Sequence, residues 1–423
     1  MIAVFDIGKT NKKLFVFDED YNIVYETSSH LNEIVDEDGD ACEDIHALTK
    51  WIRDTFNQVI QNSKFDIRAI NFSTYGASFV HLGNDGLPAA PLYNYLKPFP
   101  EDLKNKFYAT YGGEKTFAKI TASPVLGSLN SGMILYLLKH RKPEIFRRIR
   151  QSLHLPQYVS SLFTSAYCSD LTSIGCHTNL WDFEANNYHA WVNAEGVEGK
   201  LAPIRHSDSA FEIKAGSRLL YSGIGLHDSS SALIPYINYA TEPFVLLSTG
   251  TWCIALNPFN SDPLTVEELG QDCLSYLTYE GNPVKASRLF LGHEHEEGCK
   301  HLTTQFNVDP EAYRKVDIDR VETPFEAAYV LLIKRLINKQ ISSLELVLQS
   351  NIKTIFVDGG FSQNKIFMTL LAEAYPDLKV YAASVVQASA LGAALVIHDD
   401  WNSKPVRKDL LKLIAYHSNG DKP

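Results

Sequence analysis

The chain repeats one pattern in which two apolar segments flank a short turn of glycine, threonine and other polar residues. The first copy spans 2–17 with its turn at 8–11, and the second spans 245–256 with its turn at 248–251. Val, Ile, Leu and Phe on both sides favour extended backbone. Glycine lets such a turn bring N–H groups and neighbouring hydroxyls close to phosphate oxygens. An ordinary hairpin explains either copy alone, but the repetition predicts two similar domains that face each other across a cleft.

The remaining pattern alternates strands and helices. Alternation over 21–31 predicts a third strand, and helical spacing predicts a helix over 45–60 that Asp44 caps. Residues 67–74 and 79–82 predict strands on either side of a small-residue turn. The other predicted segments are a mostly helical stretch over 128–163, helices over 325–348, 365–374 and 387–395, and strands over 352–359 and 380–382. Residues 258–323 have no readable pattern.

Length and composition narrow the class of protein. A chain of 423 residues is too long for one ordinary core, and we place the domains at 1–238 and 239–423. Hydrophobic residues make up 45% and charged residues 21%, a globular balance. The net charge of −11 argues against nucleic-acid binding. Strand-sized apolar runs and scattered cysteines predict a cytoplasmic protein with reduced thiols and no membrane span.

Two polar clusters resemble metal sites but lack the spacing. In the acidic stretch 36–44, a calcium loop would need glycine at Ala41 and a bidentate acid at Ala47. The stretch 292–301 contains three histidines and Cys299 without a zinc-type spacing. We therefore expect a solvated turn at the first cluster and do not favour a metal at the second.

Three further segments carry candidate chemistry. Asp228 stands at a glycine-rich turn before an apolar helix, where a carboxylate can accept a proton from a hydroxyl or simply cap the helix. The turn at 75–78 and the loop at 93–97 combine small, aromatic and polar residues, which suits ligand contacts or structural packing equally. The glycine pair ending the strand at 359–360 leaves room for a flat ring or for tight strand–helix packing.

The order of these features resembles the sugar-kinase, Hsp70 and actin ATPase superfamily, whose fold is of the ribonuclease H-like type. Asp228 just before the second hairpin narrows the resemblance to the FGGY-family carbohydrate kinases, over essentially the whole chain. The segment 358–364 is the most specific match, and His227-Asp228 is similar to the rhamnulokinase and fuculokinase branches. The chain departs from the family at Lys9, where Thr or Ser is usual, and at 93–95, where a Trp-x-Asp-Arg motif would fall.

The resemblance implies an α/β fold of two similar domains and ATP-dependent phosphorylation of a small ketose such as L-rhamnulose, L-fuculose or a ketopentose. A kinase for a polyol or another sugar, or an inactive ATP-binding regulator, are the alternatives. The implied partners are the sugar and ATP with Mg²⁺, without nucleic acid or membrane, in a monomer or homodimer. Asp228 would be the general base and Asp6 would hold Mg²⁺. ATP would be bound by Gly8, Thr10, Asn11, Lys12, Thr249, Gly250, Thr251, Gly359, Gly360 and Asn364, and the sugar by Tyr75, Gly76, Ala77, Tyr93, His227 and Asp228.

Overall fold

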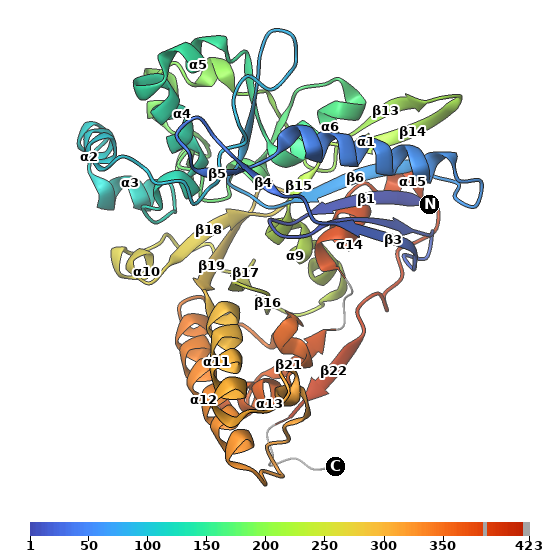
Figure 1. Cartoon of the computed structure of the whole chain (residues 1–423), viewed down its shortest axis with the longest axis vertical. Coiled ribbons are helices and arrows are strands. Elements are labelled where there is room, and N and C mark those ends of the chain that lie inside the picture. Colours follow the sequence, from blue (N-terminus) through green and yellow to red (C-terminus); the bar gives the residue numbers. More distant parts are fainter. Residues whose placement is uncertain (384–386, 418–423) are drawn as a thin grey trace.

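The computed structural model describes residues 1–383 and 387–417 and contains two α/β domains, one above the other in Figure 1. The first sheet has the strand order β13-β14-β6-β1-β2-β3, with β15 beside β6. Its strands are β1 (Ile2–Ile7), β2 (Lys12–Phe17), β3 (Ile23–Ser29), β6 (Ala69–Thr74), β13 (Ala210–Ala215), β14 (Arg218–Gly223) and β15 (Leu226–His227).

The second sheet repeats the central arrangement of the first. Its order is β18-β19-β17-β16-β20-β21-β22. Its strands are β16 (Phe244–Thr249), β17 (Cys253–Asn257), β18 (Cys273–Leu277), β19 (Pro283–Leu289), β20 (Thr354–Gly359), β21 (Lys379–Ala383) and β22 (Leu413–Tyr416). In each sheet the hairpin's first strand, β1 or β16, pairs antiparallel with its partner and parallel with a later strand, β6 or β20. The prediction of two similar domains is confirmed.

Strand β1 is buried on both faces, which explains its continuous apolar run. Ala3, Phe5 and Ile7 pack in the core with α1 (Ile45–Gln61) and α6 (Leu155–Thr164). Ile2 and Val4 point to the opposite face, where they pack with residues of α9 (Asp228–Tyr239) and α14 (Ala388–Leu395). Asp44 caps α1 as predicted, because its side chain accepts hydrogen bonds from two N–H groups of the first turn.

Helices α9 and α14 cross between the two sheets (Figure 1). A Cβ on Gly392 would lie 1.8 Å from the carbonyl oxygen of Ser231, so only glycine allows the two backbones to approach this closely. Helix α14 and the following α15 (His398–Trp401) pack on the first sheet although they come late in the chain. The predicted boundary at 238–239 falls in the last turn of α9.

Three long helices cover one face of the second sheet (Figure 1), and their apolar side chains form the largest core cluster. They are α11 (Leu291–Phe306), α12 (Pro324–Glu345) and α13 (Lys365–Ala374). The predicted helices over 325–348 and 365–374 are confirmed. The unreadable stretch 258–323 contains α10 (Val266–Gly270), β18, β19 and α11, with short strands whose positions are buried on both faces.

A mainly helical region between β6 and β13 extends the first domain. Its helices are α2 (Glu101–Thr110), α3 (Glu114–Ile120), α4 (Ser131–Arg141), α5 (Pro143–Arg148), α7 (Leu171–Ile174) and α8 (Ala190–Ala194). Its short strands are β7 (Phe79–Leu82), β8 (Gln151–His154), β9 (Ser169–Asp170), β10 (Trp181–Asp182), β11 (Asn187–Tyr188) and β12 (Ile204–Arg205). Strand β8 interrupts the predicted helical stretch 128–163 because it pairs with β7. None of the helices described has the length and apolar character needed to cross a bilayer.

The acidic stretch 36–44 already contains its own cation. It lies between β4 (Glu33–Val35) and β5 (Ala41–Glu43). The buried ammonium of Lys97 lies 2.5–2.9 Å from carboxylate oxygens of Asp36, Asp38 and Asp40. These three aspartates are the one group in the described chain with metal-like clustering, and Lys97 neutralises part of their charge.

Candidate active site

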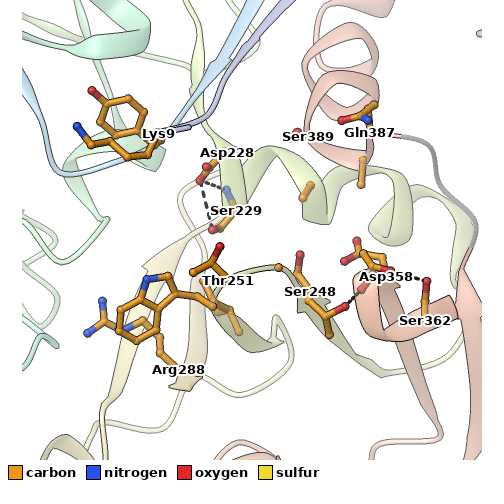
Figure 2. Close-up of a pocket in the computed structure, with 18 of the residues that line it drawn as sticks. Lys9, Asp228, Ser229, Ser248, Thr251, Arg288, Asp358, Ser362, Gln387 and Ser389 are labelled. Carbon is orange, nitrogen blue, oxygen red and sulfur yellow. Dashed lines mark hydrogen bonds between the residues drawn. The ribbon is translucent and has the colours of Figure 1, made fainter. Parts of the chain in front are cut away.

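A cleft of about 1120 Å³ lies between the two domains and is lined by both. Figure 2 shows three parts of it. Asp228 and Thr251 lie in the middle, Lys9 and Arg288 lie at one end, and Asp358, Ser362 and Gln387 lie at the other. The two phosphate-type turns and the glycine turn after β20 therefore meet in one cavity.

Asp228 enters the cleft because β15 pairs parallel with β6 and ends beside the turn at 75–78. Asp228 is the first residue of α9, and its Oδ1 accepts a hydrogen bond of 2.7 Å from the N–H of Ser229. His227 occupies the N-cap position. No described protein group donates a hydrogen bond to the other carboxylate oxygen, Oδ2. Asp228 thus satisfies one N–H of the helix start and still has an oxygen available to a ligand in the cleft.

His227 is buried directly behind Asp228. Its Nε2 lies 3.1 Å from Asp228 Oδ1 and 3.2 Å from the Sγ of Cys176. Burial alone would lower the pKa of His227, but Cys176 and Asp228 outweigh burial and raise it to about 10. A Cβ on Gly76 would lie 2.7 Å from the His227 ring, so Gly76 leaves room for the imidazole. The structure places His227 against the carboxylate, with little surface for a sugar.

Asp6 lies near the end of β1, one strand away from Asp228. Its Oδ1 accepts a hydrogen bond of 2.9 Å from the hydroxyl of Ser389 on α14. Burial, with a smaller contribution from the negative charge of Asp228, raises the pKa of Asp6 to about 6. Asp6 does not itself line the cleft, but its partner Ser389 and the nearby Asp228 do. Two neighbouring carboxylates that repel each other fit a hard divalent cation such as Mg²⁺.

Each of the two hairpin turns contains an internal hydrogen bond from its glycine. Gly8 N–H donates to the carbonyl of Asn11, and Gly250 N–H donates to the carbonyl of Trp252, both at 2.9 Å. These two amides are therefore used inside the turns. The exposed side chains of Thr10 and Thr251 line the cleft.

Lys12 does not face this cleft, contrary to the ATP-binding role assigned to it. Its buried ammonium lies 2.6 Å from Glu43 and donates to the carbonyls of Gly8 and Lys9. Asn11 is likewise absent from the cleft wall. Lys12 therefore stabilises the first turn through the carbonyls of Gly8 and Lys9, and its charge is paired with Glu43.

The glycine pair after β20 has two different functions. Gly359 has a φ of +74°, and a Cβ there would lie 1.7 Å from the carbonyl oxygen of Thr249. The Thr249 hydroxyl donates to the carbonyl of Asp358 and accepts the N–H of Phe361 at 3.0 Å. A Cβ on Gly360 would meet nothing within 4 Å. Gly359 thus allows the turn after β20 to pack against Thr249 of the second hairpin turn, and Gly360 borders open space.

A second cavity of about 1010 Å³ adjoins the cleft and contains Gly360 and Asn364 in its wall. Asn364 caps α13 through Phe367 N–H and donates to the hydroxyl of Tyr329. Both cavities share Gly250 and Thr251. Seven of the residues assigned to the nucleotide line these two adjoining cavities, whereas Gly8, Asn11 and Lys12 line neither.

The residues assigned to the sugar divide into two groups. Tyr75 and Gly76 line the cleft, although the Tyr75 hydroxyl already donates to Glu43 at 2.6 Å. Ala77 is buried with a φ of +60° and does not line the cleft. Tyr93 is also absent from the cleft wall, because its buried ring directs the hydroxyl to Glu37. The assignment of Tyr93 to the sugar is therefore not supported by its position, and Tyr95 lines the cleft instead.

Sequence reasoning missed several residues of the cleft wall: Ser248, Trp252, Tyr276, Arg288, Asp358 and Ser389. Asp358 belongs to the family-like segment 358–364, and a carboxylate at the end of a strand is a signal that could have assigned it to the site. Arg288 also had a signal, because it is a charged residue within the apolar strand 283–289. For Ser389 the only signal in the sequence was its position in a helix of small residues.

Comparisons of sequence agree with this architecture. Residues 1–210 match the model of the N-terminal domain of the FGGY family of carbohydrate kinases. Residues 241–331 and 330–397 match two models of the FGGY carbohydrate kinase C-terminal domain. The rhamnulokinase of Halalkalibacterium halodurans is 22% identical over 271 residues, which are 62% of this chain. This match spans 56% of the relative, little more than half its length.

Solved structures show the same fold over nearly the whole chain. A carbohydrate kinase from Novosphingobium aromaticivorans has a TM-score of 0.80 at 22% identity and covers 99% of this chain and 97% of its own. The ligand-bound xylulose kinase of Lactobacillus acidophilus has a TM-score of 0.82 at 15% identity, with 99% and 94% covered. The fold predicted from the sequence is confirmed. With family models matching both domains, the chain belongs to the FGGY family of carbohydrate kinases.

Proposed function

We propose that this protein transfers the γ-phosphoryl group of ATP to a hydroxyl of a small ketose, such as L-rhamnulose, L-fuculose or a ketopentose. The observation that carries the proposal is the position of Asp228. Its free carboxylate oxygen faces the middle of the cleft, between the phosphate-type turns and the end that contains Lys9 and Arg288. The rhamnulokinase relatives support the ketose class.

Asp228 acts as the general base. It takes the proton from the sugar hydroxyl while that oxygen forms its bond to phosphorus and the bond from phosphorus to the ADP oxygen breaks. The products are a sugar phosphate and ADP. His227, held against Oδ1, fixes the orientation of the carboxylate and leaves Oδ2 toward the acceptor.

Donors from both turns surround the phosphoryl group. The hydroxyls of Thr10 and Thr251 line the cleft beside Asp228, one from each domain. Such fixed donors stabilise charge on a transferring phosphoryl because they need little reorientation. The turn at Gly359 and the adjoining cavity at Gly360 receive the nucleoside.

Asp6 would hold Mg²⁺, directly or through water. The bound ion supplies positive charge that neutralises the phosphate oxygens. The hydroxyl of Ser389, which lines the cleft, donates a hydrogen bond to Asp6 Oδ1, and this hydrogen bond links α14 to the first sheet.

A coupled assay tests the proposal. The protein is mixed with ATP and Mg²⁺, and ADP release is measured with L-rhamnulose, L-fuculose, D-xylulose, glycerol and D-gluconate in turn. We expect ADP release that depends on one of the ketoses and a matching sugar phosphate by mass spectrometry. Turnover of glycerol alone would reassign the substrate to polyols. ATP binding without turnover of any acceptor would contradict the kinase function.

A further inference from the structure

Arg288 is a buried cation in the cleft wall whose hydrogen-bonding capacity is mostly unused. Its side chain is 6% exposed, and Nη2 donates to Asp272 Oδ1 at 2.7 Å. A guanidinium has five N–H donors. Within 1–383 and 387–417 no other hydrogen bond from this guanidinium is present, and its Nε is a buried donor without a partner. An unsatisfied buried donor costs free energy unless a ligand completes it.

The surroundings of Arg288 place it at the end of the cleft away from the nucleotide turn. The guanidinium lies 5.3 Å from the centroid of the Trp252 ring, and Trp252 is 37% exposed in the cleft wall. Arg288 is also close enough to His177 to lower the pKa of that histidine, after burial as the main cause. In Figure 2, Lys9 and Arg288 face this end from opposite domains, with Asp228 between them and the nucleotide turn. We call this region the acceptor end.

The charges at the acceptor end are balanced in pairs. Lys9 Nζ lies 2.8 Å from Glu33 Oε1, as Arg288 lies close to Asp272 and His227 lies close to Asp228. His177 adds no charge, because burial holds its pKa well below the usual range. A ligand with its own negative charge would leave the acceptor end with a net negative charge. Hydroxyl and carbonyl oxygens can accept charge-assisted hydrogen bonds without such a penalty.

We propose that Arg288 binds oxygens of the phosphoryl acceptor directly and that the acceptor end selects a neutral polyhydroxyl sugar over a sugar acid. The exposed indole of Trp252 then covers an apolar face of the same sugar. Both residues come from the C-terminal domain, whereas Asp228 begins the helix that leaves the first sheet. The acceptor is therefore recognised by both domains at once. This inference rests on the proposed kinase function and specifies its substrate class.

The test uses the full chain and compares Arg288→Met and Arg288→Lys with the parent. Arg320→Met serves as the control, because Arg320 is exposed and, among the described residues, forms an ion pair only with Glu322. The probes are L-rhamnulose as a neutral ketose and D-gluconate as a sugar acid. For Arg288→Met we expect KM for the ketose to rise about tenfold to a hundredfold, while ATP affinity by calorimetry stays within about twofold. The parent should use the ketose at least about tenfold better than D-gluconate by kcat/KM.

The lysine variant separates recognition from structure. Lysine keeps the charge beside Asp272 but loses the planar fork of donors. If Arg288 only holds Asp272, Arg288→Lys should have the parental KM, and that result would overturn the inference even if Arg288→Met fails to fold. A raised KM in Arg288→Lys with a parental melting temperature supports it. Preference for D-gluconate overturns the charge argument. A parent that phosphorylates none of the sugars would instead contradict the proposed function itself.

Discussion

Asp228 combines a structural hydrogen bond with the proposed function of general base in one carboxylate. Oδ1 is held by Ser229 and His227, and Oδ2 faces the cleft without a protein partner among the described residues. A general base needs both properties. The carboxylate must be held in a fixed orientation, and one of its oxygens must be free to accept a hydrogen bond from the substrate hydroxyl.

Asp228→Asn separates the two functions. Asparagine keeps the size of the side chain and its hydrogen bond to Ser229, so the melting temperature and ATP affinity should stay close to parental. Loss of the base should lower sugar phosphorylation about 10²- to 10⁴-fold. Asp309→Asn is the matched control, since Asp309 accepts a similar turn hydrogen bond from Glu311 N–H on the surface. A folded Asp228→Asn variant with more than about a tenth of parental turnover would remove Asp228 from the base position.

Asp358 should make the stability of the ligand-free protein depend on pH. Burial raises the pKa of this carboxyl from 3.8 to about 6. Because the folded pKa is raised, the folded state gains stability below pH 3.8 and loses it as pH rises through about 6. The full change corresponds to about 3 kcal/mol. Asp358→Asn lacks this titration, so its stability relative to the parent should increase between pH 4 and 7 in denaturant melts. A pH-independent difference would contradict the raised pKa.

At the scale of elements, the sequence predicted the long periodic segments and missed the short ones. Helix α13 was predicted at its observed bounds because its apolar spacing is regular. Strand β8 was missed because four residues between two helices carry no period, and pairing with β7 decides their conformation. Strands β18 and β19 are buried on both faces, so they do not alternate.

The candidate site was predictable in position but not in the direction of each side chain. Residue types at 228, 249–251 and 359 were sufficient to locate the cleft. Lys12 and Tyr93 were assigned to ligands because the sequence does not show that Glu43 and Glu37 bind them. Arg288 was missed because its position in the cleft wall depends on contacts with Asp272 and Trp252. These residues are distant from Arg288 in the sequence and come close to it only in the folded chain.

The turn after β20 gives a matched pair of glycine substitutions. Gly360→Val places a branched side chain in open space, so the variant should fold with a parental melting temperature. The same side chain narrows the second cavity, and ATP affinity should fall at least about tenfold while sugar binding persists. Gly359→Val should instead destabilise the protein strongly, because its Cβ would overlap the Thr249 carbonyl at a positive φ. Unchanged ATP binding by calorimetry in folded Gly360→Val would exclude the second cavity from the nucleotide site.

At the scale of the whole molecule, the cleft is completed by two crossing helices. Helix α9 begins with Asp228, and α14 provides Ser389, which holds Asp6. The relative position of Asp228, the proposed base, and Asp6 therefore depends on how closely these helices approach. Closure of two domains on their ligands would exclude water and limit hydrolysis of ATP.

Gly392→Ala tests this dependence with a single methyl group at a residue that does not line the cleft. The new Cβ would lie 1.8 Å from the Ser231 carbonyl oxygen, so α9 and α14 must separate. Overpacking of this kind costs about 1–3 kcal/mol, which lowers the melting temperature without abolishing the fold. Because the separation moves Asp228 relative to Asp6, kcat should fall by more than tenfold, and small-angle scattering should show less compaction with sugar and an ATP analogue. Gly270→Ala is the control, since its Cβ meets nothing within 4 Å. If Gly392→Ala retained parental kcat and compaction, the helix crossing would not govern the geometry of the cleft.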